Sequence, residues 1–385
     1  MLRWPLFLLA ISLLILGFLT VTRSPDWSPW KLAVLAGEFG HWLAALAAVV
    51  ALAAGLGSGS EPWIRGSTAA SALAAAGLLL VPAWQARRVA ADLPSRLGGA
   101  FGPARLDAPA FRGSELFLGE DPPTRPPQTL EVAPGLPLDF YRPPAADGDG
   151  PRRPCVILIH GGGWESGDRG QLPKLNHWIA SRGFAVAAVS YRLAPAHRWP
   201  AQREDVERAI AFLRERAPAL GIDPDRLVLV GRSAGGQIAQ VVAYTSRLPA
   251  IRGVVGLYAP SDLIFGYVNT HENDMLKSPA LMRRFLGGTP DSARAAYESA
   301  SGWYHVRAGM PPTLLLHGRN DALAWYRHSE RLAARLAEHR VPHVYVELPW
   351  ATHGFDYNLH GPGGQITRFA LEWFLRRVTE PPVHP

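Results

Sequence analysis

Short aliphatic and β-branched runs alternate with amphipathic stretches from residue 129 to the end of this 385-residue chain, and this alternation constrains the fold most. Such a pattern is typical of parallel β-strands joined by helices. We expect strands at Cys155–Ile159, Ala185–Ser190, Leu227–Val230, Gly253–Tyr258, Thr313–Leu316 and Val344–Leu348, and helices at Glu204–Glu215, Ala234–Tyr244, Tyr326–Glu338 and Ile366–Arg377. The predicted class is α/β, with a mostly parallel sheet flanked by helices over residues 129–385.

Three apolar stretches precede this region, at Leu6–Val21, Phe39–Gly57 and Gly66–Trp84. Each approaches the roughly 20 residues that cross a bilayer as a helix. A signal peptide is the alternative for the first stretch, although no small-residue cleavage site follows it, and a helical hairpin of a soluble domain is the alternative for the other two. We expect residues 1–85 to be a membrane anchor with about three transmembrane helices.

Charged and aromatic residues flank these stretches. Tryptophans near their ends fit an aromatic belt at the membrane surface; they are Trp27, Trp30, Trp42, Trp63 and Trp84. Glu38 and His41, one helical turn apart, are expected in the headgroup layer, with a relay or ligand site as the alternative. The protein is therefore expected to be a multi-pass membrane protein.

Basic residues are more numerous on the side of the predicted spans that carries the C-terminal region. Arg23, Lys31, Arg87, Arg88 and Arg96 lie on that side, against Arg3 and Arg65 on the other. The positive-inside rule then favours a cytoplasmic C-terminal domain. Residues 86–128 are rich in Pro, Gly and Arg, and we expect them to form an extended, polyproline-like linker.

A Gly-Arg-Ser-Ala-Gly segment, Gly231 to Gly235, joins the expected strand Leu227–Val230 to a helix. Glycines at these two positions permit a tight turn that projects the serine from the edge of the sheet at a helix N-terminus. Ser233 is therefore the candidate nucleophile. The alternative is a loop serine between glycines.

A glycine-rich loop, His160-Gly-Gly-Gly-Trp164, follows the strand Cys155–Ile159. Without side chains, Gly162 and Gly163 can turn backbone N–H groups toward an oxyanion, together with the N–H of Ala234. These three residues are the candidate oxyanion hole. The alternative is a turn with no catalytic part, and a phosphate-binding loop is excluded because no Lys-Ser/Thr pair follows.

A serine nucleophile needs a base, and the base needs a carboxylate that orients it. Where the serine lies on a G-x-S-x-G turn, the acid and then the histidine come later in the chain. Asp321 follows the expected strand Thr313–Leu316, and His353 follows Val344–Leu348. We expect the triad Ser233, Asp321 and His353, with His360 as the alternative base.

The alternation of strands and helices lapses between residues 261 and 306, which predicts an insert over the active site. The aromatic residues Phe265, Tyr267, Trp303 and Tyr304 either line a pocket for the substrate or pack the insert onto the body.

Several segments resemble the hormone-sensitive-lipase-like and feruloyl-esterase-like (BD-FAE) branch of the α/β hydrolases, over about residues 130 to 380. The matching segments are His160–Trp164, Tyr191–Pro195, Trp199–Asp205, Gly231–Gly236, Pro311–Gly318 and His353–Gly354. The resemblance implies the α/β-hydrolase fold and hydrolysis of carboxylic esters without metal or organic cofactor. Arg232 departs from the pattern, because lipase-like members usually have Asp there, and similar sequences include formamidases and prenylcysteine methylesterases.

Composition excludes other classes of protein. The single cysteine, Cys155, has no partner for an internal disulfide or a multi-cysteine metal site. The formal net charge is +7, but the Arg residues are dispersed and no nucleic-acid motif accompanies them. We therefore expect a carboxylic ester hydrolase acting on a small-molecule or lipid-like ester, with an amidase or an acyltransferase as the alternative and a non-catalytic membrane-bound binding protein as the more distant one.

Overall fold

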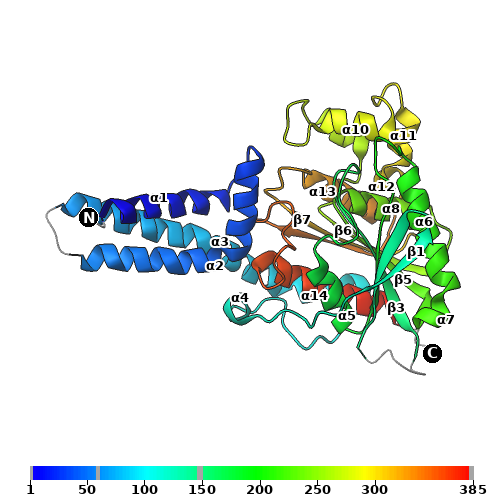
Figure 1. Ribbon diagram of the computed structural model, residues 1–385, viewed down its shortest axis with the longest axis horizontal. Helices are drawn as coiled ribbons and strands as arrows, with labels where there is room; N and C mark the ends of the chain where they lie inside the picture. The colour runs from blue at the N-terminus through cyan, green and yellow to red at the C-terminus, as the bar shows by residue number, and fades with distance from the viewer. Residues whose placement is uncertain (1–2, 58–60, 145–150, 381–385) are drawn as a thin grey trace.

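Three long N-terminal helices extend from one side of a layered α/β body in the computed structural model (Figure 1). The structure describes residues 3–57, 61–144 and 151–380. The helices of the bundle are α1 (Arg3–Leu19), α2 (Trp27–Leu56) and α3 (Pro62–Phe101). The body comprises the remaining elements, from the short helix α4 (Glu115–Leu118) to the C-terminal helix α14 (Pro362–Thr379).

The body is built on one eight-stranded sheet with the order β1-β2-β4-β3-β5-β6-β7-β8. Strands β3 to β8 are parallel to one another, and β1 and β2 form an antiparallel edge. The strands are β1 (Gln128–Ala133), β2 (Leu136–Tyr141), β3 (Arg153–Ile159), β4 (Ala185–Val189), β5 (Ile222–Arg232), β6 (Ile251–Leu257), β7 (Thr313–Gly318) and β8 (His343–Leu348). The six predicted strands and the mostly parallel sheet are confirmed, whereas β1 and β2 were not predicted.

Helices cover both faces of this sheet, because successive side chains of a buried strand point to opposite sides. In β3, Ile157 faces one helical layer and Val156 faces the other. The first layer contains α6 (Ala201–Glu215), α8 (Ala234–Thr245) and α13 (Arg327–Glu338), with the short α7 (Ala217–Leu220) beside it. The second layer contains α5 (Pro173–Ser181), α14 and the C-terminal part of α3.

The segment 261–306 contains short helices and no strand, as the lapse in the pattern predicted. Its helices are α9 (Leu263–Val268), α10 (Ser278–Leu286), α11 (Arg294–Ser299) and α12 (Gly302–His305). They lie above the sheet in Figure 1, at the carboxyl ends of the parallel strands.

The bundle has small residues inside and large apolar residues outside. Its buried positions are mostly alanines, such as Ala36, Ala47 and Ala75. Most of the large hydrophobic side chains that the structure leaves exposed lie between Trp4 and Trp84. Of the three predicted spans, α2 and α3 are long and apolar enough to cross a membrane, by length and composition, and α1 is a shorter apolar helix.

The extended linker predicted for residues 86–128 is wrong over residues 86–101. There α3 continues as a helix across Pro94, and Leu93 and Leu97 are fully buried in the core of the second helical layer. Beyond the helix, Trp373 of α14 donates a hydrogen bond from Nε1 to the carbonyl oxygen of Gly102 at 3.1 Å. Packing against α14 and β8 stabilises a helix that the local sequence disfavours, since an internal proline costs about 3 kcal/mol.

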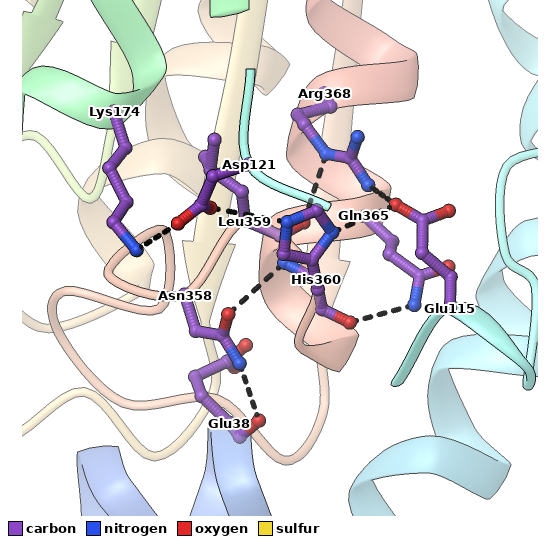
Figure 2. A network of polar contacts seen from close by, with 9 residues as sticks. All are labelled: Glu38, Glu115, Asp121, Lys174, Asn358, Leu359, His360, Gln365 and Arg368. Atoms are coloured by element: carbon purple, nitrogen blue, oxygen red, sulfur yellow. Dashed lines mark hydrogen bonds and ion pairs between the residues drawn. The ribbon is translucent and has the colours of Figure 1, made fainter. Parts of the chain in front are cut away.

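A polar network fastens residues 115–121 to the body (Figure 2). His360 lies between two carboxylates, with Nδ1 3.2 Å from Glu115 Oε1 and Nε2 3.2 Å from Asp121 Oδ1. Arg368 of α14 pairs with Glu115, and Lys174 of α5 pairs with Asp121. Residues 115–121 are therefore held to the body rather than forming a free spacer.

Glu38, for which the headgroup layer was expected, lies buried where the bundle meets the body. Its backbone carbonyl accepts a hydrogen bond from Asn358 Nδ2 at 3.1 Å, and its carboxylate accepts hydrogen bonds from the N–H of Gly363 (Figure 2 shows the first). The loop between His353 and α14 folds over this part of α2, which excludes water from the carboxylate.

Candidate active site

Ser233 occupies the sharp turn between β5 and α8. Its φ of 52° and ψ of −120° lie outside the regions that residues with a side chain usually adopt. The turn leaves no room for larger residues beside the serine, because a Cβ on Gly231 would lie 2.2 Å from the carbonyl oxygen of Gly235. The serine N–H donates to the carbonyl of Leu257 on the neighbouring β6 at 2.9 Å. Both sequence neighbours of Ser233 are buried, while the serine itself is only half-buried.

The glycine loop after β3 approaches this serine closely. A Cβ on Gly161 would lie 3.2 Å from Ser233 Cβ. Gly162 adopts a φ of 122°, which a residue with a side chain rarely adopts. Within the described part of the chain, the N–H groups of Gly162 and Gly163 donate to no other residue. The N–H of Ala234, first in α8, has no partner within its own helix, so all three predicted donors are available to a ligand oxygen.

Asp321 and His353 are hydrogen-bonded to each other. His353 Nδ1 lies 2.7 Å from Asp321 Oδ2, and the carboxylate is fully buried. The other oxygen, Oδ1, accepts from the N–H groups of Leu323 and Ala324, and His317 Nε2 lies 3.2 Å from Oδ2. Burial alone raises the pKa of Asp321, but the charge of His353 and hydrogen bonds from the two histidines outweigh it and hold the pKa well below its usual range. An ionised Asp321 places the proton of neutral His353 on Nδ1, which leaves Nε2 able to accept one.

A second buried carboxylate, Asp356, links the serine turn to the histidine. Arg232 Nε lies 2.6 Å from Asp356 Oδ2, and the Tyr258 hydroxyl donates to Asp356 Oδ1 at 2.6 Å. Burial and the charge of Asp356 raise the pKa of Tyr258 well above its usual range, so the hydroxyl stays protonated. The ring of Tyr258 packs on His353 with centroids 4.3 Å apart. Arg232, which departs from the lipase-like pattern, thus anchors a network that reaches the candidate base.

Ser233 and His353 line one cavity of about 980 Å³. The three candidate oxyanion donors line it too, and Asp321 lies behind His353. Of the four aromatic residues considered for a pocket in the insert, Phe265 is among the residues that line this cavity, whereas Tyr267, Trp303 and Tyr304 are not. The structure therefore brings the predicted nucleophile, base and oxyanion donors to a single cavity.

His360, the alternative base, belongs to the network at residues 115–121 and is not among the described residues that line the cavity. Sequence analysis missed the roles of His317, four residues before Asp321, and of Tyr258 and Asp356, which lie 98 positions apart. His317 and Asp356 carried a local signal, because they lie close in sequence to Asp321 and His353, whereas Tyr258 carried none. Among the described residues, no group of three or more His, Cys, Asp or Glu side chains is placed to hold a metal ion.

Solved structures share the fold of the body. A structure titled "Truncated form of carbohydrate esterase from gut microbiota" superposes with a TM-score of 0.54 at 21% identity, covering 63% of this chain and 91% of that chain. One titled "Bacterial Heroin Esterase" gives a TM-score of 0.54 at 24% identity, covering 67% and 84%. These likenesses, together with the sheet order, show the α/β-hydrolase fold.

Curated relatives from Mycobacterium tuberculosis match by sequence. "Probable carboxylic ester hydrolase LipM" is 32% identical over 255 residues, covering 63% of this chain and 58% of LipM. "Esterase LipC" is 30% identical over 236 residues, covering 58% of each chain. The chain thus spans somewhat over half the length of these relatives. Residues 138–336, more than half of the chain, match the sequence profile of BD-FAE. The chain belongs to the BD-FAE family.

Proposed function

We propose that the protein is a carboxylic ester hydrolase in which Ser233, His353 and Asp321 act as the catalytic triad. The observation that carries the proposal is the 2.7 Å hydrogen bond between Asp321 and His353, behind a cavity that His353 and Ser233 both line. The relatives LipM, a probable carboxylic ester hydrolase, and LipC, an esterase, support the same activity.

The reaction proceeds in two halves. Ser233 Oγ attacks the ester carbonyl carbon and gives its proton to His353 Nε2, while Asp321 holds the ring and stabilises its positive charge. The N–H groups of Gly162, Gly163 and Ala234 stabilise the oxyanion. The C–O bond to the alcohol breaks, and the alcohol leaves with the proton from His353. Water then attacks the acyl-serine and gives a proton to His353, which passes it to Ser233 Oγ as the bond to the acyl group breaks and the acid is released.

The bundle is proposed to anchor this enzyme in a membrane. Soluble helical bundles bury their large apolar residues, whereas helices packed within lipid use small residues at their contacts. The alanine-rich interior and the exposed Leu, Val and Trp side chains of α1 to α3 favour the second case. The proposed substrate class is a small-molecule or lipid-like ester, and the catalytic body is proposed to lie on the cytoplasmic side.

A fluorophosphonate probe tests the nucleophile. The purified full chain should be labelled at Ser233, as located by peptide mass spectrometry, and Ser233→Ala should lose both label and hydrolysis of p-nitrophenyl acetate. Ser246→Ala, a partly exposed serine just beyond α8, serves as the matched control and should keep both. Retained labelling or activity in Ser233→Ala would overturn the assignment, and the absence of both in the wild type would indicate a binding protein. Anilide and acyl-acceptor panels then distinguish amidase and acyltransferase activity.

A further inference from the structure

The bundle contributes one wall of the candidate active-site cavity. Trp27, Trp30 and Val34 of α2 line the same cavity as Ser233 and His353. Their spacing of three and four residues places them on one face of the helix. This wall was not predicted from the sequence, where the anchor and the catalytic region were treated as separate units.

Direct contacts hold this face of α2 over the insert. Trp27 Nε1 donates a hydrogen bond to the carbonyl oxygen of Met275 at 2.9 Å. The rings of Trp27 and Trp30 pack edge to face, with centroids 5.4 Å apart. From the insert, Leu276 and Met282 also line the cavity. The cavity therefore extends from the serine and the histidine into the space between α2 and the insert, where apolar side chains line it together with Arg23, His271 and Asp274.

The cavity is larger than a short acyl group needs. Its volume of about 980 Å³ lies at the upper end of the roughly 300–1,000 Å³ typical of sites for drug-sized ligands. Further along the same helix, Leu46, Val49 and Leu52 are exposed on the bundle surface. One helix thus joins the apolar surface of the bundle to the wall of the cavity.

We infer that the substrate is an amphiphilic ester with a long apolar chain, taken from the lipid bilayer, whose chain lies against Trp27, Trp30 and Val34 while its carbonyl reaches Ser233. This inference rests on the proposed hydrolase function and on the anchoring of the bundle in a membrane. The first turns of α2 determine chain-length specificity, and the anchor is part of the binding site.

The test compares two substitutions on adjacent faces of α2 in the full chain, reconstituted into phospholipid vesicles. Val34→Trp fills the cavity, and Leu35→Trp adds the same bulk at a position that is 45% exposed. The readout is kcat/KM for p-nitrophenyl dodecanoate divided by that for p-nitrophenyl acetate. We expect Val34→Trp to lower this ratio at least tenfold and Leu35→Trp to change it less than twofold. Equal ratios in the two variants would overturn the inference.

Additional experiments distinguish failure of this inference from failure of the proposed function. If Val34→Trp does not fold, as judged by loss of its thermal unfolding transition, Trp30→Ala takes its place and should lower the ratio at least threefold. Adding carrier phospholipid while the total concentration of the dodecanoate ester is held constant lowers the density of the ester in the bilayer and should slow its hydrolysis. An unchanged rate would contradict the inference that the substrate is taken from the bilayer. A wild type that neither labels nor cleaves either ester contradicts the proposed function itself, whereas one that cleaves both with unaltered ratios in all variants contradicts only the inference.

Discussion

The carboxylate of Glu38 in α2 accepts hydrogen bonds from the backbone N–H of Gly363, at 3.0 and 3.2 Å, in the first turn of α14. A carboxyl group at this position caps a helix from outside the helix itself, because its oxygens accept hydrogen bonds from a free N–H of the first turn. The loop between the candidate base His353 and α14 is thereby tied to the bundle.

Replacing Glu38 by Ala should destabilise the full chain by about 1–3 kcal/mol, because the buried N–H of Gly363 loses its acceptor. Glu38→Gln should lose less, since an amide oxygen still accepts a hydrogen bond. Thermal unfolding in detergent measures both, with Glu61→Ala, an exposed carboxylate whose side chain makes no capping bond, as control. Equal melting temperatures for Glu38→Ala and Glu61→Ala would contradict the capping role.

Breaking the buried ion pair of Arg232 and Asp356 should lower the stability of the chain by more than the loss of the Glu38 cap does. Asp356→Ala leaves the Arg232 guanidinium, which is 1% exposed, without its counter-charge, and the loss of one partner of a buried pair costs about 3–5 kcal/mol. Tyr258→Phe keeps the ring against His353 and removes only the hydroxyl, so it should cost much less. Urea unfolding of the two variants measures the difference, and similar midpoints would show that the ion pair contributes little.

The stability of the fold is expected to depend on pH because His328 is buried in its neutral form. His328 lines the cavity, its Nδ1 accepts from the backbone N–H of Ser261 at 3.3 Å, and burial with the nearby charges of His317 and Arg331 lowers its pKa to about 3. Between pH 6.5 and 3 the unfolded chain binds a proton that the folded chain does not, so stability falls as the pH falls, by about 1.4 kcal/mol per unit. Above pH 6.5 this contribution is fully present.

The matching variant is His328→Gln, which keeps an acceptor and cannot titrate. Its unfolding free energy, measured by urea at pH 7, 6 and 5, should fall less steeply with acidity than that of the wild type. Parallel slopes for the two proteins would mean that His328 does not remain neutral in the folded state.

Local sequence predicted the six parallel strands because each is a short apolar run that ends at a glycine, a histidine or a turn. It also predicted that Ser233, Asp321 and His353 would follow three of these strands, which is where the structure has them. The hairpin of β1 and β2 was missed although Pro134 and Gly135 separate two short runs, because neither run is the continuous apolar stretch by which the parallel strands were recognised.

Other features depend on contacts that no local pattern reports. The burial of Glu38 requires Gly363, which lies 325 positions away. The helix over residues 86–101 contains Pro94 and two adjacent glycines, so local propensity opposes it, and burial of Leu93 and Leu97 against the body outweighs that preference.

Two N-terminal deletions test whether the C-terminal part of α3 stabilises the body. Leu93, Leu97 and Phe101 of α3 pack against the body, and the ring of Phe101 contacts Phe374 of α14 with centroids 4.9 Å apart. Removing residues 1–125 should therefore expose the apolar surface of α14. Removing only residues 1–85 retains this part of α3. We expect the shorter deletion to be more soluble and to melt at a higher temperature, by size-exclusion chromatography and thermal unfolding. Equal behaviour of the two would show that residues 86–125 do not stabilise the body.

Membrane orientation can be tested on the complete chain. The first turns of α1 and α3, which contain Arg3 and Arg65, lie at the end of the bundle far from the body (Figure 1). Arg23 lines the cavity, and Arg87 and Arg88 lie in the C-terminal half of α3, the half that packs on the body. This excess of positive charge beside the body favours its retention in the cytoplasm. Green fluorescent protein fused after residue 385 and expressed in bacteria should therefore fluoresce, and alkaline phosphatase fused at the same point should stay inactive, because the phosphatase matures only outside the cytoplasm. Strong phosphatase activity with dark fluorescence would reverse the orientation, and the esters reaching Ser233 would then come from the outer leaflet and the extracytoplasmic space.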